Sequence, residues 1–210
     1  MQKLVLQFLY SVVVRAFLKI IVGVKFESGR FLLAENQFII VANHNSHLDT
    51  MAIMASLPSK IIHKVKPVAA ADYFGKTKLK ARLSNYLINT LLVQRKRDKE
   101  HPENDPINLM VKALDAGFSL IIFPEGTRGD PEVQQPLKPG VANVLLKKPK
   151  LKYVPVYLKG MGKAMPKDDN LIIPFNSSLT YGRPTQITGL GIMDVLKQIE
   201  QDLNALKEKS

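Results

Sequence analysis

The sequence predicts an α/β fold: a single layered domain with a mostly parallel β-sheet flanked by helices, preceded by an N-terminal membrane-interface helix. After Gly29, short runs rich in β-branched and aromatic residues alternate with longer helical stretches, as happens where helices cross back over a parallel sheet. The 210 residues are enough for one domain with a buried core, and no linker divides them. We therefore assign residues 1–25 to the N-terminal helix and residues 26–210 to one folded domain.

The composition is that of an ordinary folded protein with an excess of positive charge. Hydrophobic residues make up 46% of the chain and charged residues 23%, which excludes wholesale disorder. The absence of cysteine excludes disulfides, Cys-ligated metal sites and a thiol nucleophile. The formal net charge of +12 predicts an anionic partner, which is a nucleic acid, an anionic membrane or a phosphorylated ligand.

Residues 4–24 form the most hydrophobic stretch, but two cations interrupt it. Its longest uncharged run has eleven residues, whereas a spanning helix needs roughly 20. Its polar residues recur every four positions and form a narrow stripe: Lys3, Gln7, Ser11, Arg15 and Lys19. Such a helix is typical of the membrane interface, with its cations at the headgroups. The alternatives are a core helix packed on the domain, and a signal peptide or a true span. The interfacial interpretation predicts that deleting residues 1–24 weakens liposome binding and leaves the domain folded.

The remaining strands and helices are predicted from apolar runs and from the capping residues, prolines and glycines at the ends of these runs. Short β-rich runs predict strands at Phe38–Ala42, Ile61–Ala69, Leu91–Gln94, Ser119–Phe123, Tyr153–Leu158, Leu171–Pro174 and Leu179–Tyr181. Helical spacing predicts helices from Ser46 to Leu57, over Asp72–Asn89, from a cap at Asn104 or Asp105 to Gly117, over Val141–Lys147 and over Ile192–Lys207. The third helix has the most clearly marked ends, because Pro106 occupies its first turn and Gly117 follows its last.

Two strands end abruptly in polar residues, and the ligand crevice of such folds lies beyond the carboxyl ends of the strands. The strand Phe38–Ala42 leads into Asn43-His44-Asn45-Ser46-His47-Leu48-Asp49. His44 followed five residues later by Asp49 can form a general base with a carboxylate that orients it. Ser46-x-x-Asp49 also matches a capping box, and both roles are compatible. A metal site would use His44, His47 and Asp49, but no third histidine follows at hydrolase spacing, so we expect none. We expect His47 at the surface or behind the site.

The strand Ser119–Phe123 leads into Pro124-Glu125-Gly126-Thr127-Arg128. An arginine binds phosphate through its planar fork, and a neighbouring glycine lets the backbone approach a ligand closely. The alternative is a Glu–Arg surface pair on a tight turn. No serine lies in a Gly-x-Ser-x-Gly elbow, so the nucleophile is expected to come from the substrate, as a hydroxyl or water.

Together the two blocks carry a resemblance. Asn43-His44-x-Ser46-x-x-Asp49, followed about 75 residues later by Phe123-Pro124-Glu125-Gly126-Thr127-Arg128, resembles the glycerolipid acyltransferase superfamily and its 1-acylglycerol-3-phosphate acyltransferases. The segment from Asn89 to Arg95 resembles that family's block ending in arginine. Val154-Pro155-Val156-Tyr157 resembles its apolar strand around a proline, and Lys138-Pro139-Gly140 its Lys-x-Gly step.

The resemblance implies a reaction and roles for these residues. An acceptor hydroxyl attacks an acyl thioester, carried on coenzyme A or acyl carrier protein, without an acyl-enzyme. The implied acceptor is 1-acylglycerol-3-phosphate, giving phosphatidic acid; another lysophospholipid or lipid alcohol is the alternative. His44 is then the general base and Asp49 its orienter. The acceptor's phosphate and glycerol would be bound by Arg95, Glu125, Gly126, Thr127 and Arg128, with Pro155 on the acyl-donor side. No metal or other cofactor is required.

The basic surplus is concentrated between Lys60 and Arg82, where seven cations face a single acid, Asp72. Anionic lipid headgroups are the expected partner, with Tyr73 and Phe74 as a second membrane contact. We expect membrane association at the cytoplasmic face of the inner or plasma membrane, and no nucleic acid. The rival functions are a basic nucleic-acid-binding module, a hydrolase that uses the same His–Asp pair on water, and an inactive membrane-binding relative.

Overall fold

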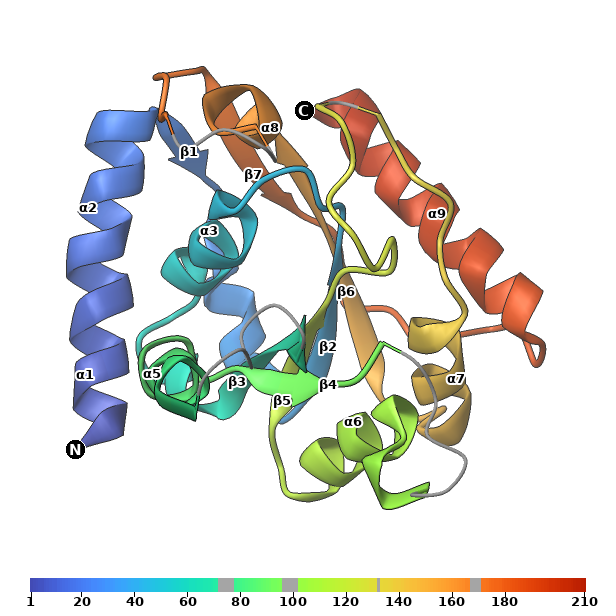
Figure 1. The fold of residues 1–210 in the computed structure, drawn as a ribbon. Helices are drawn as coiled ribbons and strands as arrows, with labels where there is room; N and C mark the ends of the chain where they lie inside the picture. The colour runs from blue at the N-terminus through green and yellow to red at the C-terminus, as the bar shows by residue number, and fades with distance from the viewer. Residues whose placement is uncertain (72–77, 96–101, 132, 167–170) are drawn as a thin grey trace.

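The computed structural model describes residues 1–71, 78–95, 102–131, 133–166 and 171–210 (Figure 1). The first part of the helix predicted from Asp72 to Asn89 lies outside these residues, as do Tyr73 and Phe74, so the second membrane contact expected there stays a prediction.

A seven-stranded sheet forms the centre of the described chain, in the order β1-β7-β6-β2-β5-β3-β4. Its strands are β1 (Val24–Phe26), β2 (Phe38–Ala42), β3 (Val65–Ala70), β4 (Leu91–Val93), β5 (Ser119–Ile122), β6 (Lys152–Lys159) and β7 (Ser177–Tyr181). The five strands from β6 to β4 are mutually parallel, whereas β7 runs antiparallel to β6, and β1 pairs parallel with β7. The predicted α/β fold with a mostly parallel sheet is confirmed.

Helices cover both faces of the sheet (Figure 1). They are α3 (Leu48–Ser56), α5 (Lys78–Ile88), α6 (Pro106–Asp115), α7 (Gly140–Lys147), α8 (Met161–Ala164) and α9 (Ile192–Lys209). Short 3-10 helices lie at η3 (Gly29–Ala34), η4 (Ile62–Lys64) and η5 (Pro102–Asn104). The N-terminal helix and α3 pack on one face, and α6, α7 and α9 on the other.

Strand β2 separates the two halves of the core. Side chains alternate between the faces of a strand. Accordingly, Phe38 and Ile40 belong to the core beneath α3 and the N-terminal helix, while Ile39 and Val41 pack on the α6, α7 and α9 side. All five β2 residues are buried, so this strand and the loop that follows it rest on a rigid base.

The largest differences from the predicted elements concern three segments, and the short helix α8 was also not predicted. The run Ile61–Ala69 becomes strand only from Val65, because η4 occupies its start. Residues 171–174 form no regular element, and their side chains are largely exposed. The short strand β1 was missed, since three residues carry too little periodicity to identify a strand. The predicted cap of α6 is present, with the Asp105 side chain accepting from the Ile107 and Asn108 backbone N–H groups.

The N-terminal helix is continuous from Gln2 to Val22 and lies along α3 (Figure 1). It comprises α1 (Gln2–Phe8), η1 (Leu9–Val14), α2 (Arg15–Phe17) and η2 (Leu18–Val22), of which η1 and η2 are π-helical. Side chains four residues apart enter the core, each at most 6% exposed: Leu6, Tyr10, Val14, Leu18 and Val22. One face of this helix therefore packs on the domain, as the alternative of a core helix predicts.

The predicted orientation of the polar stripe is wrong for its central members. Gln7 Nε2 donates to the Ser59 carbonyl at 2.9 Å, and Arg15 Nη1 donates to the Ala55 carbonyl at 2.7 Å. These side chains turn toward the domain because their polar groups satisfy backbone carbonyls there. Lys3 and Lys19 alone of the stripe are exposed.

The outward face of the same helix is apolar. Its exposed side chains are Leu4, Phe8, Val12, Val13, Ile20 and Ile21. By length and composition this is the one helix among the described residues that could cross a membrane. Because the opposite face completes the core, deleting residues 1–24 would expose buried apolar surface. We therefore no longer expect that truncation to leave the domain intact, although the assignment of residues 1–25 and 26–210 as separate units stays a prediction.

Candidate active site

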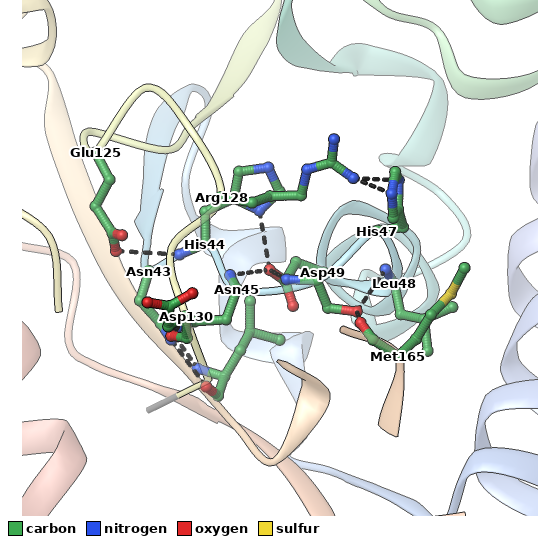
Figure 2. A network of polar contacts seen from close by, with 12 residues as sticks. Asn43, His44, Asn45, His47, Leu48, Asp49, Glu125, Arg128, Asp130 and Met165 are labelled. Atoms are coloured by element: carbon green, nitrogen blue, oxygen red, sulfur yellow. Dashed lines mark hydrogen bonds and ion pairs between the residues drawn. The ribbon is translucent and has the colours of Figure 1, made fainter. Parts of the chain in front are cut away.

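The two polar loops predicted as the site meet at one edge of the sheet. Strands β2 and β5 are parallel neighbours, with Val41 opposite Ile122. Parallel neighbours end at the same edge, so the loop after Ala42 and the loop after Ile122 emerge side by side. Figure 2 shows the resulting cluster, in which residues of the first loop face residues of the second.

At the centre of the cluster, His44 pairs with Asp49. Nδ1 of His44 lies 2.9 Å from Oδ2 of Asp49, a hydrogen bond that holds the ring in one orientation (Figure 2). The Asp49 side chain is 1% exposed and the His44 side chain 19%. The carboxylate is therefore shielded from solvent, while the imidazole reaches the surface where a substrate would lie.

The same carboxylate also holds the loop. Oδ2 of Asp49 accepts the backbone N–H of Asn45 at 2.7 Å and that of Ser46 at 2.8 Å. The Ser46 hydroxyl accepts the Leu48 N–H at 3.2 Å and donates to the Met165 carbonyl at 2.8 Å. The N-cap of α3 is His47, without a side-chain cap hydrogen bond, so Asp49 does not cap this helix as the predicted box would. The oxygen that orients His44 instead fixes the loop before the helix.

The rest of His44 is fixed by the second loop. Its ring stacks on Phe123 at a centroid distance of 4.0 Å and an interplanar angle of 19°. Its backbone N–H donates to Oε1 of Glu125 at 3.1 Å, and its carbonyl accepts the Gly129 N–H at 2.9 Å. The imidazole has little freedom to move, as a positioned general base requires.

Glu125 is a buried acid within this framework. Glu125 is only 2% exposed, and its Oε2 atom has no hydrogen-bond partner among the described residues. Burial raises the pKa of Glu125 to about 7, while the backbone N–H groups of His44 and Gln135 act in the opposite direction. The alternative of a Glu–Arg surface pair does not describe this residue, because its carboxyl points inward at the His44 backbone (Figure 2).

Gly126 adopts a backbone conformation that side chains disfavour. Its φ is +71°, and an added Cβ would lie 2.9 Å from the Lys138 side chain. The Gly126 N–H donates to the Phe123 carbonyl, and the Lys138 N–H donates to the Pro124 carbonyl at 2.7 Å. Lys138 thus folds back over the turn, and its backbone and side chain fix the path of the chain between β5 and Arg128.

Arg128 and His47 lie in contact across the two loops. Arg128 Nη1 is 2.6 Å from Nδ1 of His47, and Figure 2 shows the arginine side chain extending toward that ring. His47 is half-buried in this contact, which agrees with a position behind the site. Thr127, between Gly126 and Arg128, is exposed at the same edge. The loop therefore brings a guanidinium to His47 of the first loop and leaves Thr127 exposed.

Two predicted site residues lie further out. Arg95 follows β4, is exposed and reaches the Gly126 carbonyl with Nη1 at 3.5 Å, so it borders the second loop. Pro155 lies in the middle of β6, opposite Val41 and buried against Gly182. Pro155 is thus not brought together with the His44 cluster, and its role on the acyl-donor side stays a prediction.

Several residues that hold the site were not singled out from the sequence. Asn43 ties the end of β2 to β6, since its side chain bonds both the carbonyl and the N–H of Leu158 at 2.9 and 2.8 Å. The Asn45 side chain donates to the Asp130 carbonyl. Both asparagines stand within the first motif, but only three-dimensional pairing reveals their partners. Among the described residues, no three His, Cys, Asp or Glu side chains are grouped as metal ligands would be.

Comparison with known proteins gives two findings. A family model described as acyltransferase matches residues 23–159, which span β1 to the end of β6. The crystal structure of the 1-acyl-sn-glycerophosphate (LPA) acyltransferase PlsC from Thermotoga maritima superposes with a TM-score of 0.79. It is 21% identical, and the match covers 99% of this chain and 80% of that one. At this identity the likeness extends to the fold.

Proposed function

The chain belongs to the acyltransferase family, and from this membership we propose that it moves a fatty acyl group from an acyl thioester directly to a lysophospholipid hydroxyl. The proposed acceptor is 1-acylglycerol-3-phosphate, which gives phosphatidic acid. The structure of the Thermotoga maritima LPA acyltransferase supports this choice through its shared fold. The donor is the thioester of coenzyme A or of acyl carrier protein.

The observation that carries the proposal is the pair of His44 and Asp49. A shielded carboxylate that bonds Nδ1 leaves Nε2 as the proton acceptor, and a partly exposed imidazole can meet a substrate hydroxyl. In a hydrolase of the serine type such a pair would activate a serine. Here the sequence has no serine in a Gly-x-Ser-x-Gly elbow, so we assign to the His44–Asp49 pair the activation of the acceptor's own hydroxyl.

The reaction then follows in two linked proton transfers. His44 Nε2 takes the hydroxyl proton while the acceptor oxygen attacks the thioester carbonyl carbon. As the tetrahedral intermediate collapses, the new C–O ester bond remains, the C–S bond breaks, and the imidazolium returns its proton to the departing thiolate. A positioned general base contributes about 10²–10⁴-fold to the rate. Asp49 stabilises the imidazolium that exists between the two transfers.

We assign the acceptor's phosphate to the second loop. Arg128 and Arg95 both lie at the edge of this loop, and each guanidinium can bind a phosphate through its planar fork. Thr127 contributes a hydroxyl there, and Glu125 holds the turn against the His44 backbone. This assignment places the anionic group of the acceptor beside the base that activates its hydroxyl.

We also propose that the enzyme works at a membrane surface. The outward face of the N-terminal helix is apolar, and Leu171, Ile173 and Phe175 extend it with side chains 63%, 51% and 39% exposed. The two regions are joined, because the Phe175 N–H donates to the Val22 carbonyl. Exposed Lys19 at the end of the helix suits anionic headgroups. The proposed location is the cytoplasmic face of the inner or plasma membrane.

The test is an acceptor panel. Purified full-length protein in liposomes receives palmitoyl-coenzyme A, or palmitoyl acyl carrier protein, with 1-acylglycerol-3-phosphate or other lysophospholipids, and the products are identified by mass spectrometry. We expect phosphatidic acid as the main product, lost in His44→Ala and retained in His63→Ala, a histidine outside the site. Free fatty acid as the main product would refute the proposal in favour of hydrolysis. A different diacyl product would refute the acceptor and keep the class.

A further inference from the structure

A cavity lies at the opposite end of α3 from the His44 cluster. It opens to the surface, has a volume of about 540 Å³ and is lined by three segments: the N-terminal helix, η3 and the turn that follows α3. Asp49 occupies the first turn of α3 and Ser56, which lines the cavity, its last residue. With a rise of about 1.5 Å per residue, the two sites are separated by about 10 Å along this helix.

The cavity is basic and rich in hydroxyl groups. Three cations line it, Arg15 from the helix, Arg30 from η3 and Lys60 after α3, and none of the described lining residues is acidic. Four serines also line it: Ser11, Ser28, Ser56 and Ser59. Three cations around one hollow repel one another unless an anion lies between them.

Ser11 gives an independent indication of a ligand. Its hydroxyl oxygen is buried, yet it has no hydrogen-bond partner among the described residues. A buried hydroxyl without a partner costs free energy that a bound acceptor would recover. Arg15 lies one turn further along the same helix face. Its bond to the Ala55 carbonyl uses one nitrogen of a guanidinium that carries five N–H donors.

Exposed apolar side chains of the N-terminal helix and of η3 lie close in the chain to the residues that line the cavity. Phe8 and Val12, 63% and 51% exposed, lie on the helix next to Ser11. Leu33 lines the cavity and is 48% exposed, and Phe31 of the same η3 turn is 38% exposed. A ligand that filled this cavity would have its anion among the cations and serines and its apolar part along these side chains.

We propose that this cavity binds the phosphate headgroup of an anionic phospholipid, as a docking site separate from catalysis. Arg15, Arg30 and Lys60 pair with the phosphate, and the Ser11 hydroxyl donates to one of its oxygens. The acyl chains leave past Phe8, Val12 and Leu33 into the bilayer. The use of this site by the enzyme rests on the proposed membrane association, because a bilayer lipid reaches the cavity where the outward face of the helix lies in the membrane, whereas a soluble short-chain lipid can reach it directly.

The test is a titration in solution that does not depend on membrane binding. Dihexanoyl-phosphatidylglycerol, an anionic lipid that is not the proposed product, is added below its micelle concentration to the isotopically labelled full chain. We expect saturable NMR shifts at the backbone amides of Gly29 and Ser59. Inorganic phosphate and the zwitterionic dihexanoyl-phosphatidylcholine are the comparison ligands, and both are expected to bind at least tenfold more weakly. Equal binding of inorganic phosphate would reduce the cavity to an ion site and overturn the proposal.

Charge-matched variants localise the effect. Arg30→Glu with Lys60→Glu reverses two exposed cations at the cavity, and Lys112→Glu with Lys197→Glu reverses two exposed cations on α6 and α9, across the sheet. From the attraction of each cation for an anionic lipid surface, the first pair is expected to lose about tenfold or more in affinity and the second little. Equal losses in both pairs would show general charge attraction and refute a site.

Two further readouts separate this proposal from the proposed function. Acyl transfer between soluble short-chain substrates should be the same in the Arg30→Glu/Lys60→Glu protein as in wild type, while its binding to phosphatidylglycerol liposomes falls. If wild type binds no liposomes yet still shows the NMR shifts, membrane association fails and the headgroup site stands. If it binds liposomes and transfers acyl groups without these shifts, the headgroup site is refuted alone.

Discussion

Replacing Asp49 with asparagine separates the two tasks that the structure gives to one oxygen. Oδ2 accepts two backbone N–H groups of the loop and bonds Nδ1 of His44. Asparagine keeps the size and one acceptor oxygen but loses the charge. A hydrogen bond to a charged group contributes about 1.5–3 kcal/mol and a neutral one about 0.5–1.5, so the two backbone bonds together lose about 2–3 kcal/mol.

The expected stability change is therefore modest and the expected rate change large. For a protein of this size, a loss of 2–3 kcal/mol lowers the melting temperature by about 4–12 °C. The rate should fall by about 10²–10⁴-fold, because the imidazole loses both its orientation and the charge that stabilises its protonated form. Thermal unfolding and the initial rate of acceptor-dependent thiol release measure the two effects on the same preparation.

A double variant tests whether His44 and Asp49 act as a unit. If His44 and Asp49 act as a unit, Asp49→Asn combined with His44→Ala should be no slower than His44→Ala alone. His44→Ala by itself should change stability less than Asp49→Asn, since the backbone bonds of Asp49 remain. Rate losses that multiply in the double variant would show that Asp49 serves the fold only and would refute its role as orienter.

Three further predictions follow from neighbouring parts of the structure. Burial raises the pKa of Glu125 to about 7 in the folded protein, above its value of about 4.5 in the unfolded chain. The folded state therefore loses stability as the pH rises from about 4.5 to 7, because the carboxyl ionises more readily in the unfolded chain. Glu125→Gln should therefore gain stability relative to wild type between pH 5 and pH 8 in chemical denaturation; a constant difference would contradict the buried carboxyl. Gly126→Ala forces a side chain into φ +71° and against Lys138, and should cost about 1–2 kcal/mol with a loss of activity, whereas Gly140→Ala, with open space around it, should cost nothing. On the N-terminal helix, Leu18→Ala should cost about 2–5 kcal/mol because Leu18 is fully buried. Phe8→Ser and Ile20→Ser, both on exposed positions, should leave the unfolding free energy within about 0.5 kcal/mol. Each should weaken liposome flotation by about tenfold, the value of one large apolar side chain inserted in lipid; unchanged flotation would refute the membrane face.

The parts of the fold that the sequence predicted are those with strong local signals. The strand Phe38–Ala42 is a continuous apolar run, and the structure has the same bounds. Asp105 and Pro106 mark the start of α6 because capping acts within a few residues. The pairing of His44 with Asp49 was also accessible, since a spacing of five across a loop and a helix start allows few other arrangements.

The parts that escaped prediction depend on partners distant in the sequence. Gln7 and Arg15 were placed at the headgroups because their period of four forms a stripe, and only the packed structure shows that Ser59 and Ala55 take their hydrogen bonds. The inward carboxyl of Glu125 likewise depends on the His44 backbone, 81 residues away in the chain. Periodicity identifies a face of a helix, but it does not predict whether polar or apolar groups of the fold will cover that face.

The most direct test of the proposed mechanism is thiol release from palmitoyl-coenzyme A, measured with and without 1-acylglycerol-3-phosphate, for wild type and His44→Ala. Palmitoyl acyl carrier protein serves as donor in a parallel arm. We predict release from at least one donor that requires the acceptor and falls by about 10²-fold or more in His44→Ala. Release that is indifferent both to the acceptor and to His44 would contradict direct transfer by a histidine base.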